Sequence, residues 1–171
     1  MAFRQEISDF GAFYERTYDT AYRTALGIVR EPALAADVTQ EAYVAAYRHR
    51  HRYRGDAPSK AWLHRIVVNQ ALSALRRRRP TPPAGDLSLW TAPDGAGGTV
   101  ARMALLQALD ALPARQRAAV ILRYYHDYDY ATIAQLLNTT SNNVGAMLSR
   151  ALDRLKNALE PEQGAAAETG R

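Results

Sequence analysis

Residues 61–79 read AWLHRIVVNQALSALRRRR, and this stretch decides how the chain can fold. Helical spacing gathers its apolar side chains on one face and its polar side chains on another. The apolar face holds Trp62, Ile66, Val67, Leu72 and Leu75, and the polar face holds Arg65, Asn69, Ser73 and Arg76. Such a helix, which ends in four arginines, is suited to binding a DNA duplex and contacting its bases. Taken alone, it is equally compatible with an ordinary amphipathic helix that ends in a solvated charge run.

The composition narrows the class of protein. With 171 residues and 47% hydrophobic residues, the chain can form one average domain or two small ones. No apolar run approaches the roughly 20 residues of a membrane span, and the N-terminus lacks the apolar core of a signal peptide. The absence of cysteine excludes disulfides, thiolate zinc sites and thiol redox sensing. We therefore expect a cytoplasmic protein without membrane insertion.

The basic charge is concentrated in the first half of the chain. Residues 1–79 carry 14 Lys and Arg against 8 Asp and Glu, whereas residues 100–171 carry 8 against 7. A surface that binds a polyanion is therefore expected mainly in the first half.

Three helices are expected before residue 80. Ser8 or Asp9 can cap a helix with apolar side chains at helical spacing up to Ile28. Glu31-Pro32 interrupts this helix, and Pro32 suits the first turn of a second helix that runs to about His49. A polar loop over residues 55–60 then leads into the basic helix. We take residues 1–79 as a first module.

The second half begins after a segment without periodicity. Residues 80–99 hold four of the eight prolines and four of the ten glycines, which predicts a linker. Helices are then expected from about Val100, from Pro113 to Tyr125, over 131–137 and over 141–159. The last two flank the turn 138–140 with helix-turn-helix spacing, and Asn138 tolerates the left-handed conformation of such a turn. Residues 100–160 form a second module, and residues 161–171 read as a disordered tail.

Catalysis has little support in the sequence. The histidines show no metal-ligand spacing, and neither a glycine-rich phosphate loop nor a serine nucleophile motif is present. The pair Asp127 and Asp129 reads as turn and cap chemistry rather than as an acid–base couple. We expect no catalytic residue, metal or cofactor. The four histidines are His49, His51, His64 and His126.

Three stretches, in this order, resemble a bacterial RNA polymerase sigma factor of the extracytoplasmic-function (ECF) group. They are DVTQE at 37–41, WLHRIVVNQALSALRRRR at 62–79 and LPARQRAAVILRYYHDYDYATIAQLLNTTSNNVGAMLSRALDRLK at 112–156. The resemblance covers about residues 8–159. It implies an all-α fold of two small helical domains, sigma-2 and sigma-4, joined by a flexible linker. It also implies a transcription-initiation subunit that binds core RNA polymerase, recognises the minus-ten and minus-thirty-five promoter elements and helps to open the duplex.

The resemblance assigns the polymerase contact to an acidic patch on the second helix. Asp37, Gln40 and Glu41 would dock on the clamp helices of the beta-prime subunit, and the beta flap is expected as a further contact. An acidic patch within a basic module suits a basic protein partner better than DNA. A solvated helix face is the alternative. Ala36 stands where relatives usually carry an acidic residue.

The resemblance assigns the minus-ten element to the loop and the basic helix. The loop and Asn69 would hold a flipped base, and the arginines would hold phosphates around it. Trp62 and Ile66 are expected in the core, and Tyr53 is the better candidate for an exposed stacking platform. The expected minus-ten residues are Arg54, Gly55, Asp56, Lys60, Arg65, Asn69, Arg76 and Arg77.

The start of the last helix would read the minus-thirty-five element in the major groove. Gly145 stands where relatives usually have a basic residue, and we hypothesise that it permits a close approach to DNA or to a regulator. The expected residues are Thr140, Ser141, Asn142, Asn143, Ala146, Ser149 and Arg150.

Regulation is expected to come from outside the chain. The resemblance implies an anti-sigma factor that covers polymerase-binding surfaces. Two other functions stay open from the sequence: a stand-alone dimeric helix-turn-helix regulator, and a protein-binding adaptor without DNA binding.

Overall fold

The computed structural model describes residues 7–78 and 99–160 of the chain. All described elements are helical, in agreement with the expected all-α class. The expected linker, apart from Thr99, and the expected disordered tail lie outside the described residues.

The first module consists of three long helices, α2 (Phe10–Val29), α3 (Pro32–His49) and α4 (Ser59–Arg77). The Asp9 carboxylate accepts a hydrogen bond from the Ala12 amide and so caps α2, as expected. At the other end, Arg30 adopts the left-handed conformation with φ 62°, and its amide donates to the Leu26 carbonyl. Pro32 then opens α3, and a short 3-10 turn, η1 (Arg50–Arg52), follows it.

Helix α4 buries a wider face than the sequence spacing indicated. Val67 and Leu72 are buried as expected, whereas Trp62, Ile66 and Leu75 are only partly buried and pack against the core. The centre of the buried face lies along Leu63, His64, Val67, Val68 and Ala71. A histidine thus lies where an apolar side chain is usual.

The second module is built from shorter helices. They are α5 (Thr99–Asp110), α6 (Ala114–Val120), the π-helical turn η2 (Ile121–Tyr125), α7 (Tyr130–Leu136) and α8 (Ser141–Leu159). The chain turns between η2 and α7 at Asp127, with φ 56°, and Asp129 caps α7 by accepting from the Thr132 amide at 2.7 Å. The expected turn and cap roles of these two aspartates are confirmed.

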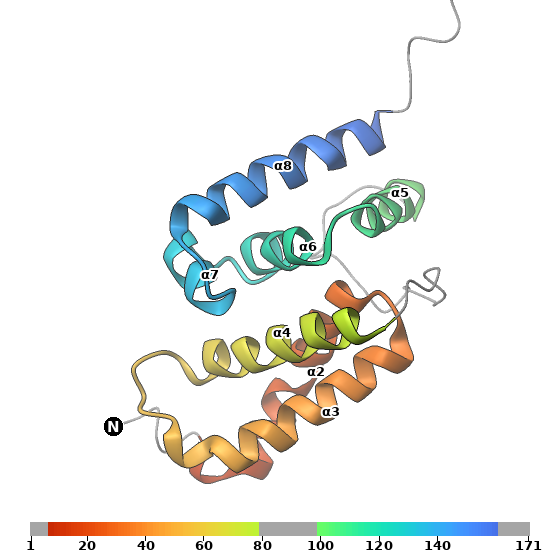
Figure 1. Ribbon diagram of the computed structural model, residues 1–171. Coiled ribbons are helices and arrows are strands. Elements are labelled where there is room, and N and C mark those ends of the chain that lie inside the picture. The colour runs from red at the N-terminus through yellow and green to blue at the C-terminus, as the bar shows by residue number, and fades with distance from the viewer. Residues whose placement is uncertain (1–6, 79–98, 161–171) are drawn as a thin grey trace, which may run out of the picture.

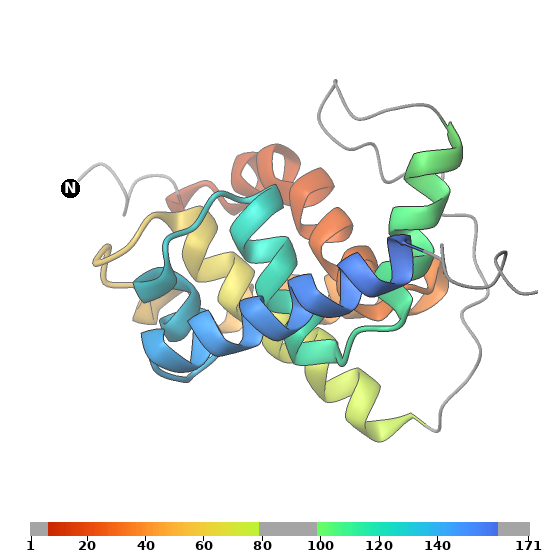
Figure 2. The same ribbon diagram turned by 90° about the horizontal axis from the view of Figure 1, so that it is seen from above.

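The two modules pack on one another in two layers. Helices α2, α3 and α4 form one layer, and α5 to α8 form the other, with α6 facing the first layer and α8 on the far side (Figure 1). Seen from above, α8 crosses over the helices of the first module (Figure 2). Buried apolar residues of both modules belong to one continuous core. Helices α2 and α4 both contact α6, α2 also contacts η2, and α4 also contacts α7.

Candidate nucleic-acid and protein interfaces

The expected minus-ten loop is held in place by Tyr53. This tyrosine is only 4% exposed, its hydroxyl donates to the Ala57 carbonyl, and its ring lies 5.3 Å from the Trp62 ring. The expectation that Tyr53 is an exposed stacking platform is therefore wrong, because the ring is buried and supports the loop from its inner side. Gly55 makes the turn with φ 81°, which favours glycine.

The polar stripe of α4 is exposed, as the helical spacing predicts. Arg65, Asn69, Arg76 and Arg77 all reach solvent. At the end of the helix the guanidinium of Arg76 donates to the Ser73 hydroxyl at 2.9 Å, and that of Arg77 to the Ser73 carbonyl at 3.3 Å. These contacts are local and exposed, so both arginines stay available for an anionic partner. We call the eight expected minus-ten residues the minus-ten surface.

Part of the minus-ten surface lines a pocket at the junction of the two modules. Arg54, Asp56 and Arg65 share this pocket, of about 590 Å³, with Trp62. Its opposite wall comes from α7, the first helix of the helix-turn-helix, through Thr132, Gln135 and Leu136. Asn69, Arg76 and Arg77 lie farther along α4 and do not line it. The structure therefore brings together only the loop end of the minus-ten surface, and it places α7 against that end.

The expected polymerase patch forms a groove on α3. Asp37, Gln40 and Glu41 are exposed and line a pocket of about 450 Å³. Val44, with 46% of its surface exposed, adds an apolar side chain to the groove. We call this site the acidic groove; its further lining residues are Ala45, Arg48, His49 and Gln70.

The helix-turn-helix has the geometry that its turn predicts. Asn138 adopts φ 50°, and the Thr139 amide donates to the Ala134 carbonyl at 2.8 Å. Thr140 caps α8, because its hydroxyl accepts from the Asn143 amide at 3.2 Å. Val144 and Leu148 are buried. The first turn of α8 is thus fixed and its outer face is free to meet a partner.

The expected minus-thirty-five residues lie on this outer face with one exception. Ala146 is half-buried, whereas the others are exposed. Gly145 is also half-buried, and a methyl group added there would meet the Tyr130 ring at 3.5 Å, an ordinary contact distance. The fold therefore does not require glycine at this position. We call the outer residues the reading face; they are Thr140, Ser141, Asn142, Asn143, Ser149 and Arg150.

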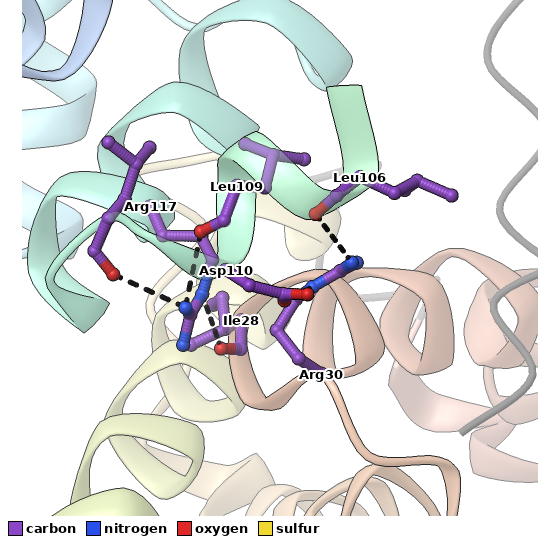
Figure 3. Close-up of polar contacts among 7 residues, drawn as sticks. Ile28, Arg30, Leu106, Leu109, Asp110 and Arg117 are labelled. Carbon is purple, nitrogen blue, oxygen red and sulfur yellow. Dashed lines mark hydrogen bonds and ion pairs between the residues drawn. The ribbon is translucent and has the colours of Figure 1, made fainter. Parts of the chain in front are cut away.

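Two buried arginines join the modules, and no sequence pattern predicts this role for them. The guanidinium of Arg30 pairs with the Asp110 carboxylate at 2.5 Å and donates to the Leu106 carbonyl at 2.9 Å (Figure 3). That of Arg117 donates to the Ile28 carbonyl of α2 at 2.7 Å. Burial, with the nearby charge of Arg30, lowers the pKa of Arg117 to about 10, so the group stays charged at neutral pH.

Arg117 also closes the loop between α5 and α6. One terminal nitrogen donates to the Leu109 and Leu112 carbonyls, each at 3.3 Å (Figure 3). A single side chain thus satisfies carbonyls of both modules. The two arginines lie far apart in the sequence and outside any charge run, which is why no sequence pattern revealed them.

A histidine from each module meets at the same junction. The ring centroids of His64, on α4, and His126, after η2, are 4.1 Å apart. Nδ1 of His64 lies 2.8 Å from the Tyr128 hydroxyl, and Nε2 of His126 lies 2.7 Å from the Thr24 hydroxyl of α2. Helical spacing places His64 on one face with Ala61, Val67 and Val68, and this polar residue among apolar ones was the one available signal of this contact.

Known proteins resemble the chain in sequence over both modules. Residues 13–81 match the family Sigma-70 region 2, and residues 102–155 match the family Sigma-70, region 4. The ECF RNA polymerase sigma factor SigM of Mycobacterium tuberculosis H37Rv is 33% identical over 150 residues, which cover 88% of this chain and 76% of the relative. The chain belongs to the ECF RNA polymerase sigma factors. The ECF RNA polymerase sigma-E factor of Escherichia coli K12 is 29% identical over 140 residues, with 73% of each chain covered.

Solved structures support the fold of this ECF sigma factor. The sigma factor RpoE of Bartonella quintana, in complex with the anti-sigma factor NepR, aligns with a TM-score of 0.75 and 21% identity. The alignment covers 91% of this chain and 99% of that one. CnrH, in complex with the cytosolic domain of CnrY, aligns with a TM-score of 0.66 and 23% identity over 91% and 96% of the two chains.

The ECF sigma factor belongs to a family of transcription initiation factors that bind RNA polymerase and recognise promoters. Within residues 7–78 and 99–160, no group of three His, Asp or Glu side chains is placed to hold a metal ion. None of the described helices combines the length and apolar character that a membrane crossing requires.

Proposed function

We propose that this ECF sigma factor divides its work between two surfaces of the first module and one of the second. The acidic groove binds core RNA polymerase, the minus-ten surface binds and opens the minus-ten element, and the reading face of α8 binds the minus-thirty-five element. In this proposal residues 1–79 act as the sigma-2 domain, residues 80–99 as the linker and residues 100–160 as the sigma-4 domain.

The observation that carries the proposal is the opposite charge of two surfaces on one three-helix module. The acidic groove on α3 presents carboxylates and the exposed Val44, which suits a basic protein partner. The exposed stripe of α4 presents arginines, which suit phosphates. A duplex and a protein can therefore be bound at once by different helices.

The partners follow from the surfaces. We assign the beta-prime clamp helices to the acidic groove. We assign the beta flap to the second module, where Leu152 and Leu159 of α8 are exposed. One structural neighbour, RpoE, was solved with the anti-sigma factor NepR, and another, CnrH, with the cytosolic domain of CnrY. We propose that an anti-sigma factor likewise covers the acidic groove of this chain.

Run-off transcription tests the proposal. Genomic promoter fragments are transcribed by core RNA polymerase with and without the chain, and specific transcripts are expected only with both. Tight sequence-specific DNA binding without core polymerase would instead indicate a stand-alone regulator. Polymerase binding without initiation on any fragment would indicate a protein-binding adaptor.

A further inference from the structure

The histidine pair at the junction has no part in the proposed promoter contacts. His64 has no exposed surface, and His126 reaches it from the other module, between η2 and α7. The pair lies among α2, α4 and the Tyr128 turn, beside the junction pocket where α7 meets the minus-ten loop.

The hydrogen bonds of Thr24 show which nitrogen of the neutral His126 ring carries the proton. The Thr24 hydroxyl donates its single hydrogen to the Thr20 carbonyl at 2.6 Å. It can therefore only accept from His126, whose Nε2 lies 2.7 Å away. Nε2 of His126 thus carries the ring proton, and Nδ1 keeps the lone pair.

A second proton on the His64 ring is unfavourable. Its Nδ1 is paired with the Tyr128 hydroxyl, and its Nε2 is buried without a partner among the described residues. An imidazolium would add a buried charge and leave an N–H group without an acceptor. The neighbouring His126 ring would then face a positive charge at close range.

The part of the chain that the structure describes provides no opposing charge for an imidazolium. Burial lowers the pKa of His126 to about 4, and burial, with His126 and Lys60, holds the pKa of His64 well below its ordinary value of 6.5. Lys60 of α4 also acts on His126. The Tyr125 ring lies 4.7 Å from the His126 ring, and burial raises the pKa of Tyr128 to about 12, so that its hydroxyl is neutral at pH 7 and below.

The carboxylates on the adjoining elements are directed elsewhere. On α2, Asp19 pairs with Arg23 at 3.1 Å. After η2, Asp127 is 95% exposed and pairs with Arg123. Asp129 is also exposed and caps α7. None of them neutralises the histidine pair.

We propose that His64 and His126 form an acid-sensitive latch that keeps the two modules closed while both rings are neutral. A proton on either ring favours the open arrangement, in which α7 no longer lies against the minus-ten loop. The further step, in which the opening frees the minus-ten surface for DNA, rests on the proposed function. The opening itself does not rest on it.

The direction and size of the effect follow from linkage. The closed arrangement is fully favoured above the ordinary histidine pKa and is weakened as pH falls through 6.5 towards 4. One such histidine raises the open-to-closed ratio about fourfold between about pH 7.5 and pH 6.0, and two raise it about fifteenfold.

Thiol labelling of the full chain measures this ratio directly. The chain has no cysteine, so Ala61→Cys, which lies buried in the junction pocket, provides a single thiol. Its labelling rate is divided by that of the exposed Asn157→Cys, which corrects for the pH dependence of thiol reactivity. The normalised rate is expected to rise about fifteenfold from about pH 7.5 to 6.0. An unchanged rate overturns the latch.

Two pairs of histidines make the test specific. His49 and His51 are exposed, so the rise in labelling rate should persist when both are replaced in His49→Gln/His51→Gln. In a His64→Gln/His126→Gln background the rate should be equal at both pH values, whether slow or fast, because nothing in the junction titrates. A rise that survives the second change, or disappears with the first, overturns the latch.

NMR titration of the histidine rings gives an independent reading on the unaltered chain. His64 and His126 should remain neutral at pH 6.0. Ordinary titration of His64 and His126 in the closed chain overturns the latch. Neither experiment contains polymerase or DNA, so its failure leaves the proposed function intact. Failure of run-off transcription, in turn, leaves the latch intact.

Discussion

The arginines of this chain fall into two groups that differ in environment. Arg76 and Arg77, at the end of α4, are exposed, and among the described residues they bond only to Ser73 of their own helix. Arg30 and Arg117 are buried, and each bonds to main-chain carbonyls of the opposite module.

The difference teaches that one side-chain type performs two tasks here. A buried guanidinium that donates to main-chain carbonyls fixes the position of those backbone groups. An exposed guanidinium contributes little to folding and remains free to bind phosphates. Changes in the two groups should therefore have effects on different measurements.

Arg117→Met should have the largest effect on stability. The change removes the Arg117 donors from the carbonyls of Ile28, Leu109 and Leu112. The Leu109 carbonyl keeps the Leu112 amide as a donor. We expect a loss of about 3 kcal/mol in the free energy of unfolding, measured by denaturant titration. The exposed Arg154→Met serves as the control and should change it by less than about 0.5 kcal/mol. A loss below about 1 kcal/mol for Arg117→Met would show that the junction does not depend on this side chain.

The Arg30–Asp110 pair should show a smaller, coupled effect. Single replacements by Ala and the double replacement form a mutant cycle. Because the pair is largely buried, we expect a coupling free energy of about 1–3 kcal/mol from unfolding measurements. The Arg23–Asp19 pair, in which the aspartate is exposed and the arginine half-buried, should couple by less than about 0.5 kcal/mol when treated in the same way. Equal coupling in both pairs would remove the distinction between buried and exposed charges.

Arg76→Ala/Arg77→Ala should leave stability within about 0.5 kcal/mol of the unaltered chain. Its effect should appear in DNA binding by the complex with core polymerase. The slope of the logarithm of affinity against the logarithm of salt concentration should fall by about 2, since each phosphate contact contributes about 0.9. An unchanged slope would mean that these arginines do not contact phosphates.

Gly145→Arg should have the smallest effect and adds an arginine of the exposed kind to α8. The helix should gain up to about 1 kcal/mol because glycine disfavours helix interiors. The added side chain should steepen the salt dependence of binding to the minus-thirty-five element by about 0.9. Gly145→Ala separates the two terms, since it should stabilise the helix without changing the slope. Weaker binding by Gly145→Ala would support the hypothesis that glycine permits a close approach.

Most of the fold was predictable because its signals are local. Capping by Asp9, the break at Pro32 and the left-handed Asn138 are each set by the chemistry of one or two residues. The apolar spacing of α4 predicted its direction of burial but not its centre, because the centre includes His64, and a histidine adds nothing to an apolar pattern.

The packing of the two modules was not predictable from the sequence. It depends on Arg30 and Arg117, each of which donates to a main-chain carbonyl of the other module, and every residue type supplies a carbonyl. The exposed part of the candidate site was easier, because runs of charge and helical stripes predict surfaces. The prediction for Tyr53 was wrong because composition alone does not distinguish an exposed ring from one that supports a loop.

Transcription from a promoter with a pre-opened minus-ten element tests the division of work most directly. Asp37→Arg/Glu41→Arg and Asn69→Ala should both reduce run-off transcription from the closed duplex, whereas the exposed Glu15→Arg on α2 should not.

On the pre-opened template, Asn69→Ala should regain most of its activity because unstacking, which costs a few kcal/mol, is no longer required. The acidic-groove variant should stay inactive, since it does not bind core polymerase. Recovery of the groove variant, or continued failure of Asn69→Ala alone, would contradict the assignment of the two surfaces.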